Sequence, residues 1–184
     1  SSVVVSVSVK VGIEHEDCGH LTVKLRGPNN TVIALVSRPG VSEGADDGGG
    51  ILAGDLSGYD KGNPVTFQDA AAVAAEDMGD TIGPFSYVCK DDGICAFKPD
   101  QGSAPGPSSL QAAFKGADAV GKWRLCVGDS IWLVGGKLQQ WSLTVVSSDG
   151  SFTRATAADL GLGIKDDGYD GSLGSMACVD IDVK

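Results

Sequence analysis

The clearest feature of the chain is a regular alternation of apolar and polar residues in short segments. Residues 3–11, VVVSVSVKV, alternate with the period of two that places every second side chain on one face of a β-strand. Residues 21–25, LTVKL, alternate in the same way, and the apolar segment 31–37 follows a turn at 27–30 (GPNN). Two strands joined by so short a turn predict a β-hairpin.

The second half of the chain repeats this pattern. Residues 122–127, KWRLCV, and residues 138–146, LQQWSLTVV, each alternate with a tryptophan on the apolar face, and a last strand is predicted in ACVDIDVK at 177–184. We therefore expect Trp123 and Trp141 in the core.

The segments between these strands are rich in glycine. Residues 40–63 form a long loop, and residues 147–174 form a Gly- and Asp-rich tail. Residues 67–76, FQDAAAVAAE, favour a helix by propensity, with a short helical turn or an irregular strand as alternatives, and SLQAAF at 109–114 is expected to form a short turn. Many short strands separated by turns predict an all-β fold, a sandwich or a barrel.

Charge and composition exclude two classes of function. The chain has 14 Lys and Arg against 24 Asp and Glu, a formal charge of -10, so its surface repels nucleic-acid phosphates and tolerates cations. No apolar segment approaches the ~20 residues of a membrane-spanning helix. The chain begins without an initiator Met or a signal peptide, which we expect of a processed product or of a piece of a longer protein.

Five cysteines suggest an oxidising compartment. Cys89 and Cys95 bracket a short polar loop, KDDGI, where a disulfide is expected and a metal site is the alternative, although no CxxC pair supports zinc. A disulfide indicates a secreted protein. Because the number is odd, at least one thiol is unpaired or pairs with another chain.

Five segments in a fixed order carry a family resemblance. They are VGIEHEDCGHLTVKLRGPNNT at 11–31, FQDAA at 67–71, SLQAAFKG at 109–116, GKWRLCVGD at 121–129 and GKLQQWSLTV at 136–145. Together they resemble the P-domain found beside subtilisin-like proprotein convertases. The resemblance implies a jelly-roll-like β-sandwich without catalytic activity, which stabilises a neighbouring serine protease or acts as a free-standing extracellular module.

The chain departs from the family pattern at three places. His20 stands where the family usually has Asp, Val134 stands where an Asp often precedes the glycine, and the loop at 40–63 is longer than usual. The first two changes remove oxygen ligands and argue against an inherited Ca²⁺ site at those positions.

The two ends of the chain suggest a rearranged order of strands. Residues 1–146 form the P-domain-like sandwich, while IKDDGYDGSLGSMACVDIDV at 164–183 resembles the opening segment of the family, which the N-terminus lacks. We favour a circular permutation over a cut through a tandem array, because a cut array would expose an unpaired edge. The tail 147–184 would then complete the same sandwich, one domain in all, with the first and last ten residues as neighbouring strands.

This arrangement also places the remaining cysteines. Cys126 and Cys178 would both face outward, which is compatible with a disulfide between them but does not require one. Cys18 would be the odd thiol.

Calcium is the favoured cofactor. Ca²⁺ binds six to eight oxygens, and the acidic loops of the chain offer them, with solvated turns as the alternative. The candidate ligands are Asp69, Asp129, Asp166, Asp167 and Asp170.

Other chemistry has weaker support. The chain has two histidines, His15 and His20, on either side of an acidic turn, and the resemblance explains His15 as structural. The string at 174–177 (GSMA) resembles a subtilase nucleophile segment, but the companion His and Asp segments are absent. No Gly-x-Ser-x-Gly or phosphate loop is present, and the sequence nominates no carboxylate pair for glycoside hydrolysis.

Trp132 is the candidate binding residue. It lies in the loop 128–136, which either folds over one end of the sandwich or presents the indole ring to a partner. The function predicted is a secreted, non-catalytic accessory module that binds another protein or domain. The alternatives are a glycan- or matrix-binding adhesion module and a hydrolase with an unrecognised site.

Overall fold

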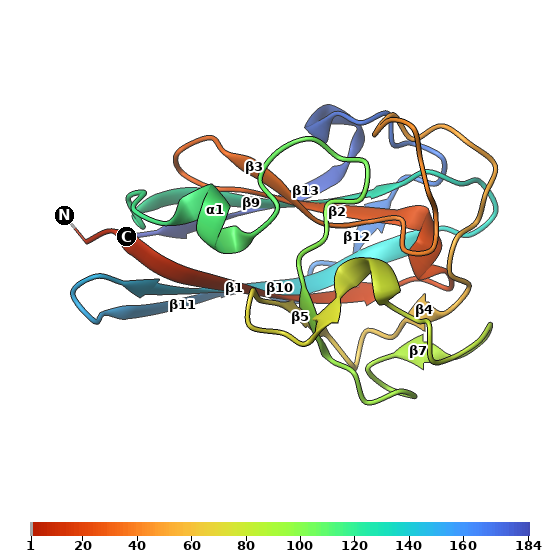
Figure 1. Cartoon of the computed structure of the whole chain (residues 1–184), viewed down its shortest axis with the longest axis horizontal. Coiled ribbons are helices and arrows are strands. Elements are labelled where there is room, and N and C mark those ends of the chain that lie inside the picture. The colour runs from red at the N-terminus through yellow and green to blue at the C-terminus, as the bar shows by residue number, and fades with distance from the viewer. Residues whose placement is uncertain (1) are drawn as a thin grey trace.

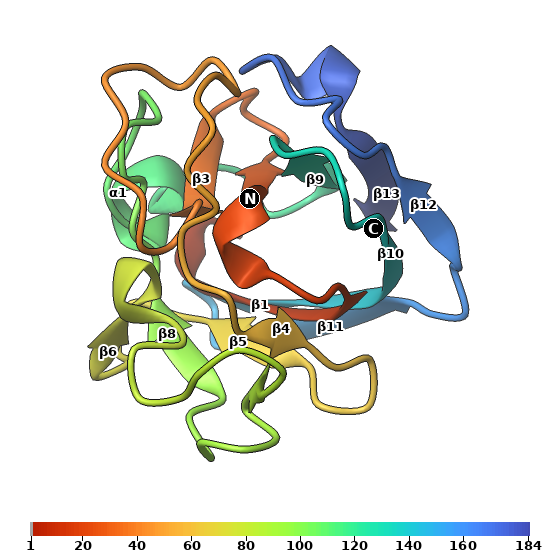
Figure 2. The same cartoon turned by 90° about the vertical axis from the view of Figure 1, so that its right-hand side faces the viewer.

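Two β-sheets packed face to face make up most of the structure, a computed structural model that describes residues 2–184 (Figure 1). Seen from one end, the two layers enclose the core, with the short helix α1 on one side and β12 and β13 on the other (Figure 2). The predicted all-β sandwich is confirmed. No helix within the described residues is long and apolar enough to cross a membrane.

The first sheet is built around the long antiparallel pair β1 and β10. The order is β11-β10-β1-β5-β8-β6, and β12 also pairs with β10. Its strands are β1 (Val4–Glu14), β5 (Val65–Phe67), β6 (Val73–Ala74), β8 (Ala96–Lys98), β10 (Gly136–Ser147), β11 (Phe152–Ala157) and β12 (Leu162–Ile164).

The second sheet is antiparallel and has the order β13-β9-β2-β3. Its strands are β2 (Leu21–Arg26), β3 (Val32–Ser37), β9 (Gly121–Asp129) and β13 (Ala177–Val183). The predicted hairpin is the pair β2 and β3. A small parallel pair, β4 (Gly58–Tyr59) and β7 (Tyr87–Val88), lies outside both sheets.

The core follows the alternation of the sequence. Trp123 and Trp141 are completely buried, as predicted, and Phe114 of α1 (Leu110–Phe114) packs edge-on against Trp123 with ring centroids 4.9 Å apart. Inward residues of both sheets therefore exclude water along the length of the sandwich.

Three segments between the main strands are described by the structure in more detail than the sequence allows. Residues 67–76 form no regular helix and instead follow the two expected alternatives: β5 ends at Phe67, and the short strand β6 leads into a 3₁₀ turn, Ala75–Asp77. Residues 110–114 form the helix instead, because two carboxylate oxygens of Asp69 accept the N–H groups of Leu110 and Gln111. The Gly- and Asp-rich tail contains β11 and β12, two strands that its composition did not predict.

The terminal strands are not neighbours, contrary to the expectation. β1 pairs with β10 and β5, whereas β13 pairs with β9 over seven residues in the other sheet. β1 and β13 thus contribute apolar side chains to the core from opposite sheets. The start of β1 and the end of β13 lie at the same end of the sandwich (Figure 1).

Two disulfides are present. Cys89 pairs with Cys95 across the short polar loop, and Cys126 of β9 pairs with its register partner Cys178 of β13. Cys126 lies on the outer face of its sheet, but Tyr169 and Met176 of the tail cover it. Cys18 is the remaining thiol and is buried.

Candidate functional site

The end of the sandwich opposite the termini is formed by loops from distant parts of the chain. We call it the loop end and define it by residues 15–20, 51–57, 84–87 and 130–135. It lies at the right of Figure 1 and faces the viewer in Figure 2. Contacts join its parts: His20 O accepts the N–H of Ser130 at 3.0 Å, and Cys18 N–H donates to Ser57 O at 2.6 Å.

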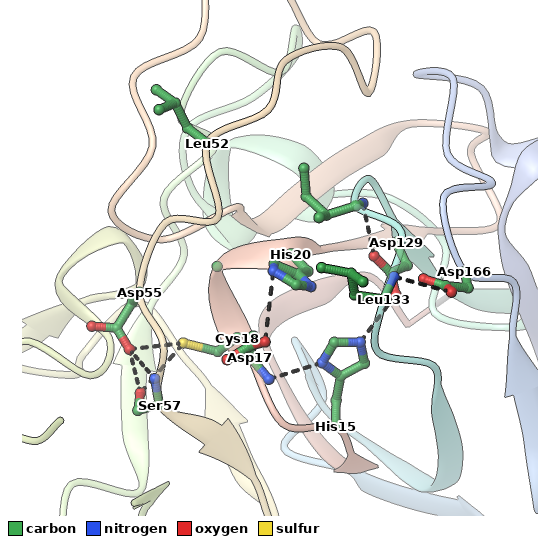
Figure 3. A network of polar contacts seen from close by, with 12 residues as sticks. His15, Asp17, Cys18, His20, Leu52, Asp55, Ser57, Asp129, Leu133 and Asp166 are labelled. Carbon is green, nitrogen blue, oxygen red and sulfur yellow. Dashed lines mark hydrogen bonds and ion pairs between the residues drawn. The ribbon is translucent and has the colours of Figure 1, made fainter. Parts of the chain in front are cut away.

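A buried pair, His15 and Asp129, lies at the centre of the loop end (Figure 3). His15 Nδ1 accepts the backbone N–H of Asp17 at 3.1 Å, so in a neutral ring the proton is on Nε2. Nε2 then donates to Asp129 Oδ2 at 3.0 Å, while Asp129 Oδ1 accepts the N–H of Ile131 at 3.0 Å. The pair joins the end of β1 to the end of β9.

His20 lies next to this pair and is also buried. Its ring meets that of His15 edge-on at a centroid distance of 5.7 Å, and its Nε2 lies 3.7 Å from Asp17 Oδ2. Burial lowers the pKa of His20 and raises the pKa of Asp17, with their mutual attraction opposing both shifts. Nδ1 of His20 has no hydrogen-bond partner among residues 2–184.

The geometry offers no support for hydrolysis at these histidines. His15 and His20 are 3% and 2% exposed, so a substrate cannot reach them without movement of the loops. The neighbouring thiol of Cys18 is fully buried against Asp55 and Ser57, and burial raises its pKa far above the usual range. A thiol held in its protonated form is a poor nucleophile.

The carboxyl group of Glu76 has a strongly raised pKa. Burial raises its pKa from 4.5 to about 7, and its Oε1 accepts the N–H of Ser37 at 3.3 Å. The 3₁₀ turn that contains Glu76 lies against β3, and Gly102 lies close to the carboxyl group. This setting is that of a packed structural carboxyl group.

Large apolar side chains project from the loop end. Trp132 is 66% exposed, Leu133 70% and Phe85 95%. Leu133 and Phe85 have φ angles of 126° and 66°, a backbone region that such residues seldom adopt. Of the two predicted conformations of the 128–136 loop, the structure shows the one that presents Trp132 to solvent.

Acidic residues lie next to these exposed apolar residues. The N–H of Leu133 donates to Asp166 Oδ2 at 3.3 Å. Phe85 lines a hollow of about 300 Å³ together with Glu16, Asp17, Leu56, Pro84 and Tyr87. The loop end therefore combines exposed apolar surface with carboxylates at its margin.

The five predicted calcium ligands are only partly brought together. The backbone oxygen of Asp129 accepts N–H groups from Gly168 and Tyr169, so the 166–170 loop lies against the end of β9. Asp69 lies apart, at the N-terminus of α1. Hydrogen bonds from Ser172 lower the pKa of Asp170 to about 2, and Asp167 occupies a turn with a φ of 49°. Calcium binding at these residues stays a prediction.

The comparison with known families gives a match in the first part of the chain. Residues 4–49 match the family model of the proprotein convertase P-domain. The resemblance inferred from the motifs is thus confirmed across β1, β2 and β3, a quarter of the chain that includes His15 and His20. No curated protein and no solved structure matches the chain.

Two features of this P-domain-like chain were missed by sequence reasoning. Phe85 and Leu133 were not singled out, although each stands in a Gly-containing loop (IGPFSY and WLVGG) where an apolar side chain has no strand to pack against. The convergence of His15, His20 and Asp129 was also missed. Its signal was present in the motif segments, because His15 and Asp129 lie where strands end and His20 lies where the next strand begins.

Proposed function

We propose that this chain is a non-catalytic accessory module that binds another protein, or a neighbouring domain, through its loop end. The observation that carries the proposal is the exposure of Trp132, Leu133 and Phe85 at one end of the molecule. Aromatic side chains of this kind dominate the binding energy of many interfaces.

The backbone at two of these positions is in an unusual conformation. A non-glycine residue in a sparsely populated region of φ costs about 1–3 kcal/mol, and such strain is concentrated at functional sites. In Phe85 and Leu133 this cost is combined with the exposure of a large apolar side chain. Neither the strained backbone nor the exposed side chain stabilises the isolated fold. Both would favour binding if these side chains insert into a pocket on a partner.

The chemistry of the partner follows from the charges around the apolar residues. Glu16, Asp17 and Asp166 border the exposed side chains, and the whole chain has a formal charge of -10. A complementary surface has an apolar pocket bordered by Lys and Arg. The match to the P-domain supports an accessory role, and the two disulfides support export to an oxidising compartment.

A second candidate is a glycan-binding adhesion module. The exposed indole of Trp132, next to the acidic 166–170 loop through the Leu133–Asp166 hydrogen bond, favours it. Pyranose rings bind to exposed aromatic faces. The variants described in the next paragraph distinguish the two candidates.

The test uses a double variant at the loop end, Phe85→Ser with Trp132→Ser, and a control at the opposite end, Phe152→Ser. Phe152 is 57% exposed and lies in β11, whose pairing with Val146 places it near the start of β1. Proteins captured by the wild-type chain are identified by mass spectrometry, purified and titrated calorimetrically against all three proteins. A glycan array is run in parallel.

We expect a purified protein partner to bind the wild type and the control equally. Loss of two interface anchors of about 2 kcal/mol each weakens its binding by well over tenfold in the loop-end variant. Equal affinity for all three proteins would contradict the proposal. Saturable binding of a glycan that is lost with Trp132→Ser alone would favour the second candidate.

A further inference from the structure

Three buried side chains with atoms that can ligate a metal converge at the loop end. One ligand atom from each of His15, His20 and Asp129 lies within 4.8 Å of the other two, and all three residues are buried (Figure 3). They come from separate segments: the residue after β1, the 3₁₀ turn before β2 and the last residue of β9. We propose that they bind one divalent cation of the zinc type.

Asp129 has a carboxylate whose charge is buried. Its carboxylate is completely buried, and its side-chain partners within the described residues are the ring of His15 and the N–H of Ile131. With His15 in the neutral form that its hydrogen bonds indicate, neither partner is a cation. A buried carboxylate without a positive partner is costly, and a divalent cation supplies the missing charge.

His20 has a buried ring nitrogen that is available to a cation. Its side chain is buried and its Nδ1 has no hydrogen-bond partner in the part of the chain that the structure describes. Its other nitrogen, Nε2, lies 3.7 Å from Asp17 Oδ2. A metal-binding histidine binds the cation through one nitrogen and donates from the other to a carboxylate that orients the ring. Asp17 is close enough to accept such a hydrogen bond from Nε2 after a small movement.

The third residue, His15, has to give up both of its hydrogen bonds to take part. In the metal-free protein Nε2 carries the proton and donates to Asp129, while Nδ1 accepts the N–H of Asp17. The cation takes the place of the Nε2 proton, and Nδ1 acquires a proton in its turn, so that the ring remains neutral overall. The N–H of Asp17 must then move away from Nδ1, and binding is expected to shift the 16–17 peptide.

The donor set selects the kind of cation. Two imidazole nitrogens and one carboxylate oxygen suit Zn²⁺ and similar transition metals, which take four ligands at about 2.0–2.2 Å. Ca²⁺ requires six to eight oxygens and gains little from imidazole. This site is therefore distinct from the calcium site predicted from the acidic loops, although Asp129 belongs to both sets.

Binding would have a structural consequence for the loop end. Asp129 directly precedes the loop 130–135, and the two histidines flank the turn between β1 and β2. A cation would join these segments and fix the base from which Trp132 and Leu133 project. The proposal does not rest on the nature of any partner that these residues bind.

The experiment measures binding of Zn²⁺ to the metal-free protein by calorimetry, with Ca²⁺ as the comparison. We expect one equivalent of Zn²⁺ to bind and the unfolding midpoint to rise by at least about 5 °C at a hundredfold excess over the dissociation constant. His20→Gln should weaken binding more than about tenfold. The controls Cys18→Ser and Asp170→Asn, which remove the free thiol and an exposed carboxylate, should bind as the wild type does.

A measurement on the wild-type protein covers the case in which a variant fails to fold. The chain has two histidines, so a long-range proton–nitrogen NMR spectrum contains two imidazoles. Zn²⁺ should shift His15 Nε2 and His20 Nδ1. Unshifted imidazole resonances, absence of stoichiometric binding, or full affinity in folded His20→Gln would each overturn the proposal.

Discussion

The ion pair between Lys24 and Asp46 fixes the tail to the sandwich, and replacing Lys24 by Met should weaken the whole fold. Lys24 Nζ donates to Asp46 Oδ2 at 2.7 Å and to the backbone oxygen of Gly171 at 3.0 Å, and it lies 5.2 Å from the ring centroid of Tyr169. The hydroxyl of Tyr169 donates to the other oxygen of Asp46 at 2.5 Å. One amino group thus joins β2, the long loop and the tail.

The magnitude follows from burial. The side chains of Lys24 and Asp46 are 7% and 4% exposed, so the variant leaves a carboxylate buried without its cation. Breaking a buried pair from one side costs about 3–5 kcal/mol. In a chain of this length each kcal/mol lowers the unfolding midpoint by about 2–4 °C, which predicts a fall of about 6–20 °C.

The assay is urea and thermal unfolding with both disulfides intact, and Lys122→Met is the matched control. Lys122 pairs with Asp180 at 3.2 Å, but its side chain is 59% exposed. Exposed pairs contribute about 0–1 kcal/mol. The double variant Lys24→Met with Asp46→Asn should be more stable than Lys24→Met alone, because the unpaired charge is gone. If Lys24→Met cost no more than Lys122→Met, or if the double variant recovered nothing, the reasoning would be refuted.

Three further predictions concern stability. The pKa of Glu76 is raised to about 7 in the folded protein, so the contribution of its carboxyl group to the free energy of unfolding is present below pH 4.5 and is lost as the pH rises through 7. Glu76→Gln should therefore raise the free energy of unfolding by about 1–2 kcal/mol at pH 8, allowing for partial exposure, and have no effect at pH 4. An effect that did not depend on pH would contradict this. Deletion of residues 175–184 removes β13, which pairs with β9 over seven residues, and should abolish cooperative unfolding in calorimetry; an unchanged midpoint would show that β13 is dispensable. Replacing Cys126 and Cys178 by Ser opens a loop with a sequence separation of 52 and should cost about 4 kcal/mol in urea unfolding, a prediction that a loss below about 1 kcal/mol would exclude.

The sequence alone determined those elements whose signal is local. Alternation with a period of two identified β1, β2, β9, β10 and β13, because each strand has one face in the core. The same alternation placed Trp123 and Trp141 inside. The disulfide between Cys89 and Cys95 could be expected because so short a loop brings its ends together.

Tertiary structure decided the features that depend on distant contacts. Residues 67–76 favour a helix by composition, yet strand pairing with β1 and β8 took precedence, while Asp69 stabilised the start of α1, 41 residues further along the chain. His15 and Asp129 meet across 114 residues, and no local pattern indicates that contact. The loop end likewise exists only in the folded chain, because four segments with no shared periodicity are placed together by the strands that they connect.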